Sequence, residues 1–260
     1  MRTRVLSALI MAPLLLIVFF GGYALLAGCF IIGIMSVREF FNGFRKMEVY
    51  PSHIIAYTSA AALYLINILD VYAKLYSLWF YGVILASLLY LFKDYGRKPE
   101  NGAATLIGIF YVIFFSFNVA LIDQLGNYSI MVWLVFITAF GTDIMAYFTG
   151  CAIGKHKLCP EISPKKTVEG SIGGLIGSVI LCGAFGYFFT CGLLYDCLIL
   201  GALGGVLSQL GDLTASIFKR KMGIKDFGNL IPGHGGVLDR FDSVLFTAPM
   251  VYYYVTIIIV

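Results

Sequence analysis

Two aspartates, Asp212 and Asp239, bracket the most polar stretch of a largely apolar chain. Basic side chains, glycines and further acids lie between and just beyond them. A magnesium ion typically takes one or two protein carboxylates together with substrate phosphates. Lysine and arginine hold phosphate groups, and glycine lets the backbone approach a ligand closely. We therefore expect metal-assisted phosphoryl chemistry here, with Asp212 and Asp239 as candidate metal ligands.

The spacing of these residues predicts how they are positioned. Asp212, Ser216 and Lys219 stand at i, i+4 and i+7, so one helix would carry them on one face. Asp239 follows a glycine pair at the entry to the last apolar run, where it can approach Asp212. An ion pair of Asp239 with Lys219 or Arg240 is the structural alternative, and the sequence leaves it open.

A further acid, Asp143, lies within an apolar run. An ionisable side chain at membrane depth is a candidate site residue by default, because an isolated charge there is costly. The alternative for Asp143 is capping of a neighbouring helix. We expect a role at the site, as a ligand or as a group that orients one.

The segment 161–174, with the sequence EISPKKTVEGSIGG, is a second candidate for anion binding. Ser163-Pro164 can start a helical turn, and two lysines follow it directly. The Gly173-Gly174 pair is expected at the mouth of the next helix, where free amides favour an anion. A loop that merely carries positive charge on the cytoplasmic side of a membrane is the alternative.

The composition predicts an integral membrane protein. Of the 260 residues, 60% are hydrophobic and only 12% charged, and the mean hydropathy is +0.91. Soluble domains average about 25% charged residues. No basic tract interleaved with aromatic residues indicates a nucleic-acid partner. We predict an all-α polytopic fold in the lipid bilayer.

Nine apolar runs suggest about nine transmembrane helices. Two precede Val37 and are separated at Gly21-Gly22, which favours a retained helical hairpin over a cleaved signal peptide. The others cover about 54–69, 78–92, 103–122, 130–149, 172–191, 197–215 and 241–260. Several are near the short limit of about 17 residues for crossing a bilayer.

The distribution of positive charge predicts the orientation. With a cytoplasmic N-terminus, 17 of the 18 Lys and Arg residues fall on the cytoplasmic side and Lys74 alone falls outside. The two longest polar loops, 151–171 and 216–240, then face the cytoplasm together. We expect one domain over 1–260, with apolar helices in 1–128 and the catalytic helices and loops in 129–260.

Three motifs resemble one enzyme family. Ser216-x-x-Lys219-Arg220, Lys225-Asp226 and His234-Gly235-Gly236-x-x-Asp239-Arg240-x-Asp242 together resemble the signature of the phosphatidate cytidylyltransferases, also called CDP-diacylglycerol synthases. Upstream, Asp143-x-x-Ala146-Tyr147-x-x-Gly150 and Ser163-Pro164-Lys165-Lys166-Thr167-x-Glu169-Gly170 are similar to further motifs of that family. The resemblance covers about residues 140–242.

The resemblance implies a Mg²⁺-dependent reaction of CTP with phosphatidic acid, which gives CDP-diacylglycerol and pyrophosphate for phospholipid synthesis. It implies Asp212 and Asp239 as metal carboxylates and leaves room for a second cation such as K⁺. Residues expected to act in catalysis are Asp212, Asp239, Lys219, Arg220, Lys225, Asp226, Arg240 and Asp242. Residues expected to bind substrate are Asp143, Lys165, Lys166, Glu169, Ser216, Asn229, His234, Gly235 and Gly236.

The resemblance also implies a multi-pass protein of the cell membrane with its active site facing the cytoplasm, and it leaves a homodimer open. Two nearby alternatives are a CTP-dependent lipid kinase, which would need a base to activate a hydroxyl, and a cytidylyltransferase for another lipid phosphate. An ion-coupled transporter also carries intramembrane acids, but it needs no Lys- and Gly-rich loop. Measurement of CTP turnover with different lipid phosphates and lipid alcohols distinguishes these alternatives.

Overall fold

The computed structural model describes residues 16–69, 74–93, 98–230 and 235–260, and most of them are helical. The α-helices are α2 (Gly22–Phe44), α3 (His53–Ile68), α4 (Lys74–Leu89), α5 (Pro99–Ile107), α6 (Phe115–Asp123), α7 (Val132–Ile153), α8 (Val168–Phe189), α9 (Leu194–Lys221) and α10 (Leu238–Tyr254). A π-helical segment, Gly108–Phe114, joins α5 to α6, and a second one, Val255–Ile259, extends α10. Two short strands, β1 (Lys157–Cys159) and β2 (Ser163–Thr167), form an antiparallel hairpin.

The helices confirm a multi-pass membrane protein. Seven helical segments in the described residues are long and apolar enough to cross a bilayer, and α3 is shorter. They correspond to eight of the nine apolar runs, and most of the first run falls on residues 1–15, outside the described part. Residues 16–20 are helical and are followed by Gly21 and Gly22, with φ of 59° and 54°. The predicted break between the first two runs is therefore present.

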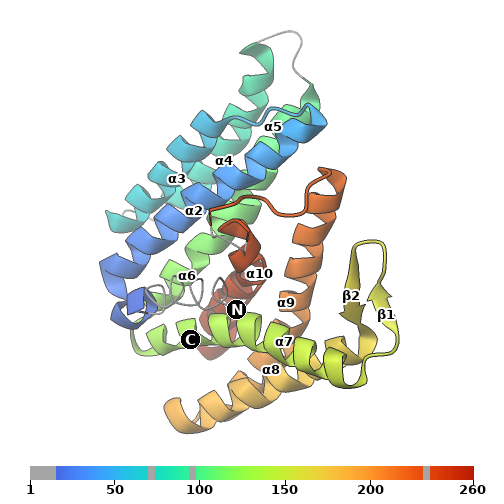
Figure 1. Cartoon of the computed structure of the whole chain (residues 1–260). Coiled ribbons are helices and arrows are strands. Elements are labelled where there is room, and N and C mark those ends of the chain that lie inside the picture. The colour runs from blue at the N-terminus through green and yellow to red at the C-terminus, as the bar shows by residue number, and fades with distance from the viewer. Residues whose placement is uncertain (1–15, 70–73, 94–97, 231–234) are drawn as a thin grey trace.

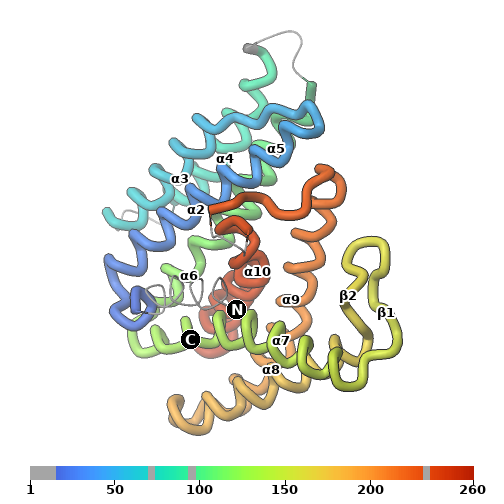
Figure 2. Tube along the Cα trace, in the orientation of Figure 1, coloured from blue at the N-terminus to red at the C-terminus, as the bar shows by residue number. Residues whose placement is uncertain are grey.

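Helices α9 and α10 lie between two groups of helices (Figure 1). Helices α2 to α5 form one group, and α7 and α8 cross the other end of the molecule (Figures 1 and 2). The chain packs α7 on α8, α8 on α9 and α9 on α10, while α10 also contacts α6, α7 and α2. The N-terminal helices therefore pack directly against the element that carries Asp239.

Glycines bring α7 and α8 into close contact. A Cβ atom added at Gly173 would lie 2.2 Å from Thr149 Oγ1, and one at Gly177 would lie 2.4 Å from Met145 Cγ. Small residues allow this approach of two helices in a membrane. The expectation that Gly173-Gly174 sits at the mouth of a helix is wrong, because α8 already begins at Val168.

The hairpin corrects a second expectation. Ser163-Pro164 does not start a helical turn; it begins strand β2, which pairs with β1 through Cys159. Proline is tolerated in such an edge strand because an edge N–H needs no ladder partner. The helix starts later, where the Thr167 hydroxyl accepts a hydrogen bond from the Gly170 N–H at 3.1 Å. The all-α prediction therefore describes the membrane helices but misses this hairpin.

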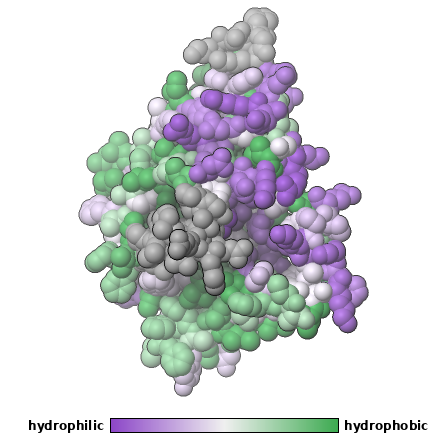
Figure 3. Space-filling model, in the orientation of Figure 1, coloured by the Kyte–Doolittle hydropathy of each residue, from purple (hydrophilic) through white to green (hydrophobic). Residues whose placement is uncertain are grey.

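Polar residues gather on one side of the molecule. Figure 3 shows hydrophilic residues over the hairpin and the adjacent end of α9, and hydrophobic residues over the left and lower parts of the same view. The C-terminal end of α2 lies on this polar side as well (Figure 1). This arrangement agrees with the one-sided distribution of Lys and Arg along the sequence.

Candidate active site

The hairpin places one of its two adjacent lysines against α9. Side chains alternate between the two faces of a strand, so Lys165 is exposed while Lys166 is partly buried. Lys166 Nζ forms an ion pair with Asp212 Oδ2. Nearer the hairpin tip, Arg220 Nε donates a hydrogen bond to the Ile162 carbonyl at 3.2 Å. Two contacts thus hold the hairpin to α9, one of them through a candidate metal ligand.

The predicted face of α9 is confirmed at its first two residues. The Ser216 hydroxyl donates to Asp212 Oδ1 at 3.3 Å, one helical turn away. The Asp212 side chain is 26% exposed, so a ligand can reach its carboxylate.

Asp239 lies in the first turn of α10 and is almost fully buried, with 2% of its side chain exposed. Lys219 Nζ donates to its Oδ1 at 2.8 Å. Its Oδ2 accepts from the Phe227 N–H at 2.8 Å and the Gly236 N–H at 2.9 Å. The ion pair with Lys219, which the sequence leaves open as an alternative, is therefore present. Asp239 also ties the loop before α10 to that helix.

Two further acids lie within electrostatic reach of Asp212. Asp143, on α7, interacts with Asp212, Lys166 and Arg240, and its carboxylate accepts from the Ser243 hydroxyl at 3.5 Å. Asp242, on α10, interacts with Asp212 and Asp143. Carboxylates from α7, α9 and α10 therefore lie within electrostatic reach of one another, and Lys166, Lys219 and Arg240 act on the same group. Asp143 is exposed although it lies in a spanning helix, which fits a group that lines a cavity.

The remaining candidates of the signature lie in or near the loop 222–237. Lys225, Asp226 and Asn229 are exposed there. Gly235 has φ of 85°, a conformation that strongly favours glycine. His234 lies outside the described residues. The side chains of Lys225, Asp226 and Asn229 are therefore available to a ligand.

Glu169 is occupied by local contacts at the start of α8. Its carboxylate contacts His156 Nδ1 at 2.6 Å and accepts from the backbone N–H groups of Lys155 at 3.1 Å and His156 at 3.2 Å. These bonds hold the turn between α7 and β1. A direct contact of Glu169 with substrate stays a prediction.

The donor set suits a metal that arrives with substrate. No group of three or more His, Cys, Asp or Glu side chains in the described ranges is arranged to hold a metal ion by itself. Asp212 and Asp239 each have a lysine partner, Lys166 and Lys219. Magnesium is usually bound by one or two carboxylates plus substrate phosphates rather than by a closed protein cage. Asp212, with its partly exposed carboxylate and the Ser216 hydroxyl beside it, fits that mode. Both oxygens of Asp239 are occupied by Lys219 and two backbone N–H groups, so Asp239 would bind a metal ion only in place of the Lys219 ammonium.

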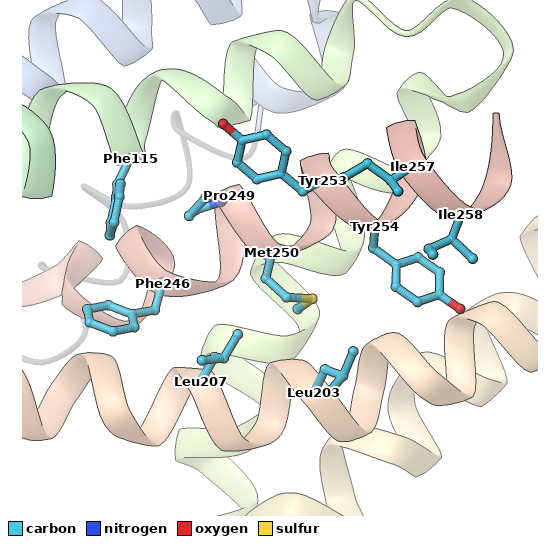
Figure 4. A pocket seen from close by; sticks show the side chains of 10 residues that line it. All are labelled: Phe115, Leu203, Leu207, Phe246, Pro249, Met250, Tyr253, Tyr254, Ile257 and Ile258. Atoms are coloured by element: carbon cyan, nitrogen blue, oxygen red, sulfur yellow. The ribbon is translucent and has the colours of Figure 1, made fainter. Parts of the chain in front are cut away.

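A separate, open pocket of about 520 Å³ lies along α9 and α10, between the middle of α9 and the C-terminal part of α10 (Figure 4). Its lining is Phe115, Leu203, Leu207, Phe246, Pro249, Met250, Tyr253, Tyr254, Ile257 and Ile258. None of the candidate site residues lines it, and its walls offer almost only carbon atoms. This apolar cavity is unsuited to a nucleotide triphosphate.

Comparison with known proteins decides the family. The model of the cytidylyltransferase family matches residues 2–258. The chain belongs to the cytidylyltransferase family. It is 33% identical over 261 residues to a phosphatidate cytidylyltransferase of Staphylococcus haemolyticus, covering 95% of each chain. It is 41% identical over 174 residues to a phosphatidate cytidylyltransferase of Bacillus subtilis, in an alignment that covers 66% of this chain and 64% of the relative.

A further phosphatidate cytidylyltransferase, from a Synechocystis species, is 48% identical over 128 residues, covering 48% of this chain and 43% of the relative. The shorter alignments with the Bacillus and Synechocystis proteins span less than two thirds of those proteins. The Staphylococcus haemolyticus alignment shows that the similarity to this family runs along nearly the whole chain.

Two side chains from the N-terminal half of this cytidylyltransferase family member reach the site, and the sequence reading missed both. Glu39, on α2, accepts hydrogen bonds from the N–H groups of Val237 at 3.1 Å and Leu238 at 2.9 Å. Tyr111 interacts electrostatically with Asp242 and Asp212. Glu39 had a weak signal, because it is an acid just after an apolar run, between Arg38 and two phenylalanines. Tyr111 had none, since tyrosines recur throughout the chain.

Proposed function

We propose that this chain transfers CMP from CTP to phosphatidic acid at the polar site between the hairpin, α9 and α10. The chain is a nucleotidyltransferase of the cytidylyltransferase family, and it synthesises CDP-diacylglycerol from CTP. The observation that supports this site is the pair of ion pairs Lys166–Asp212 and Lys219–Asp239. The first pair joins the hairpin to α9 and the second joins α9 to α10, and Asp242 lies within electrostatic reach of both Asp212 and Lys219.

The phosphate of phosphatidic acid needs little activation. A phosphomonoester has a second pKa near 6, so this phosphate is largely a dianion at neutral pH. One of its oxygens attacks the α-phosphorus of CTP, and the bond from that phosphorus to the oxygen bridging to the β-phosphorus breaks. Pyrophosphate leaves with the bonding electron pair. No side-chain nucleophile or general base is required.

The protein then has to bring two anions together in line and stabilise the charge on the leaving group. Lys166 and Lys219 offer ammonium groups beside carboxylates, and Arg240 lies within electrostatic reach of Asp143. Lys165 and Lys225 are exposed on the polar side and can meet the phosphates of CTP. When no substrate is bound, the neighbouring carboxylates offset the mutual repulsion of these cations.

We propose Asp212 and Asp239 as the carboxylates that hold Mg²⁺, with the Ser216 hydroxyl beside Asp212. When bound, the ion neutralises phosphate oxygens and the charge that develops on pyrophosphate. A second cation such as K⁺, and a homodimer, stay predictions. The active site faces the cytoplasm in this proposal, because the hairpin and the end of α9 carry the positive charge that marks the cytoplasmic side.

The direct test uses the purified protein in detergent with CTP, phosphatidic acid and Mg²⁺. A chloroform-soluble cytidine product should form, and EDTA should abolish it. Asp212→Asn should remove turnover while the protein still purifies as a folded species. Asp196→Asn is the matched control, because Asp196 accepts from the Tyr254 hydroxyl at 3.1 Å near the opposite end of α9. Wild-type activity in Asp212→Asn would refute the role of Asp212 as a metal ligand.

A further inference from the structure

We infer that Glu39 is a positioning residue for the transfer reaction, because it fixes the loop that presents Asp239 and Gly235-Gly236. This inference rests on the proposed function and adds a residue from the N-terminal helices to the site. The motifs of the sequence place every candidate at or after Asp143, so nothing in them points to α2.

The first observation is the set of bonds that Glu39 makes. Its Oε1 accepts from the Val237 N–H at 3.1 Å, and its Oε2 accepts from the Leu238 N–H at 2.9 Å. These N–H groups belong to the start of α10, where a helix leaves its first amides without partners. Both oxygens of one carboxylate from a distant helix thus fix the direction in which α10 begins.

The second observation is how closely the loop surrounds the carboxylate. A Cβ atom added at Gly228 would lie 2.4 Å from Glu39 Oε1, and one added at Gly236 would lie 2.3 Å from Oε2. Only glycine leaves room for the loop at these two positions while Glu39 keeps its place. The loop is therefore shaped around the Glu39 side chain.

The third observation is that Asp239 holds the same loop through other atoms. Asp239 accepts from the N–H groups of Phe227 and Gly236, while Lys219 binds its other oxygen. Gly236 thus donates its N–H to Asp239 while its α-carbon lies against Glu39. If Glu39 is removed, the loop can shift, and Asp239 shifts with it.

Both oxygens of Glu39 are occupied by backbone amides, so its effect on the reaction must pass through the groups it holds. Outer partners of metal-binding groups typically change activity by roughly 10–100-fold when they are removed. We expect Glu39→Ala to lower kcat by that factor. Glu39→Gln should recover part of the loss, because the amide oxygen can still accept one of the two N–H bonds.

Asp123→Ala is the matched control. Asp123 also accepts from the N–H of a helix start, that of Gly22, at 2.6 Å, but it lies at the other end of α2. Its removal should lower the thermal midpoint in detergent without lowering kcat per folded molecule. A purely structural role for Glu39 would give the same pattern, with loss of stability and an unchanged kcat.

Gly228→Ala provides a second route to the same contact. In the wild-type background its Cβ should displace Glu39 and lower kcat. In the Glu39→Ala background the space is free, so kcat should change by no more than about twofold, as expected for two residues that act through one contact. If the double variant lost kcat by the product of the two single-variant factors, the inference would be overturned.

Hydrogen exchange of the amides in 222–238 should be measured on the same proteins. Faster exchange at Val237 and Leu238 in Glu39→Ala, together with lowered kcat, supports the inference, whereas unchanged exchange or unchanged kcat overturns it. Activity of the wild-type enzyme tests the proposed function, and the variants test the role of Glu39. If the wild-type enzyme forms no lipid product, the proposed function fails. Hydrogen exchange in Glu39→Ala then still shows whether Glu39 orders the loop.

Discussion

Lys166 of strand β2 forms an ion pair with Asp212 of α9, and this contact fastens the hairpin to the polar end of that helix. Its neighbour Lys165 is exposed on the opposite face of the strand. The hairpin thus delivers one lysine of an adjacent pair to the carboxylate cluster and leaves the other outside. Because side chains alternate along a strand, Lys165 and Lys166 have different surroundings although their side chains are the same.

This relationship predicts different effects for the two lysines. Lys166→Ala should raise the apparent KM for CTP or phosphatidic acid by roughly tenfold or more, because a hydrogen bond to a charged group contributes about 1.5–3 kcal/mol. Lys165→Ala should have a smaller effect on either KM. Steady-state kinetics with each substrate varied in turn makes the comparison, and equal effects of the two substitutions would contradict the geometry.

The Lys219–Asp239 pair predicts a loss of stability. Lys219→Met should lower the free energy of unfolding by about 3 kcal/mol, because it leaves a buried carboxylate without its ammonium partner. This value is the low end of the usual range, since Asp239 keeps its two backbone N–H bonds. Denaturant unfolding in detergent measures it.

The control for that experiment is an exposed ion pair. Lys98 lies 3.9 Å from Glu48, and both side chains are mostly exposed, so Lys98→Met should leave the unfolding midpoint nearly unchanged. A comparable loss of stability in both variants would mean that the Lys219 effect does not come from burial of its partner.

Removal of the Tyr111 hydroxyl should affect stability and activity in different ways. Its hydroxyl is buried and has no hydrogen-bond partner among the described residues, and it lies within electrostatic reach of Asp242 and Asp212. Removal of an unsatisfied buried hydroxyl is close to neutral or stabilising. Tyr111→Phe should therefore keep or raise the thermal midpoint. It should still lower kcat, by up to about tenfold, the size of one hydrogen bond, because it removes a hydroxyl dipole within electrostatic reach of Asp242 and Asp212.

Tyr64→Phe is the control for Tyr111. The Tyr64 hydroxyl is also buried and lacks a partner in the described part of the chain, but its ring packs on Phe30 and Phe117, away from the acids. Its removal should leave kcat unchanged. If both substitutions lower kcat alike, the effect belongs to helix packing and not to the site.

The orientation in the membrane predicts which cysteines can be labelled from each side. Cys151 is exposed at the polar end of α7, and Cys191 is exposed after α8. Single-cysteine variants should react with a membrane-impermeant thiol reagent in intact spheroplasts only at Cys191. Inverted vesicles should give the opposite result, and labelling of Cys151 in spheroplasts would reverse the proposed orientation.

The sequence predicts the membrane fold well because hydropathy and charge act locally. The break at Gly21-Gly22 and the helical face of Asp212 and Ser216 can be predicted from spacing alone. The hairpin could not be, because Ser-Pro also fits a helix start, and the contacts of the hairpin with α9 join residues far apart in the sequence.

The contacts between distant helices could not be predicted either. Glu39 contacts Val237 and Leu238, which lie 198 and 199 residues further along the chain, so only the packing of α2 against α10 reveals the contact. The choice of Lys219 as the partner of Asp239 likewise depends on the path of the loop between α9 and α10.

The most direct test of the central claim follows the two ends of the CTP triphosphate. The purified protein is incubated with phosphatidic acid, Mg²⁺ and CTP labelled with ³²P at either the α- or the γ-phosphorus. We predict that the α-label enters the chloroform-soluble lipid while the γ-label appears in pyrophosphate. Transfer of the γ-label to lipid, with the α-label remaining in water-soluble nucleotide, would contradict the account and indicate a lipid kinase.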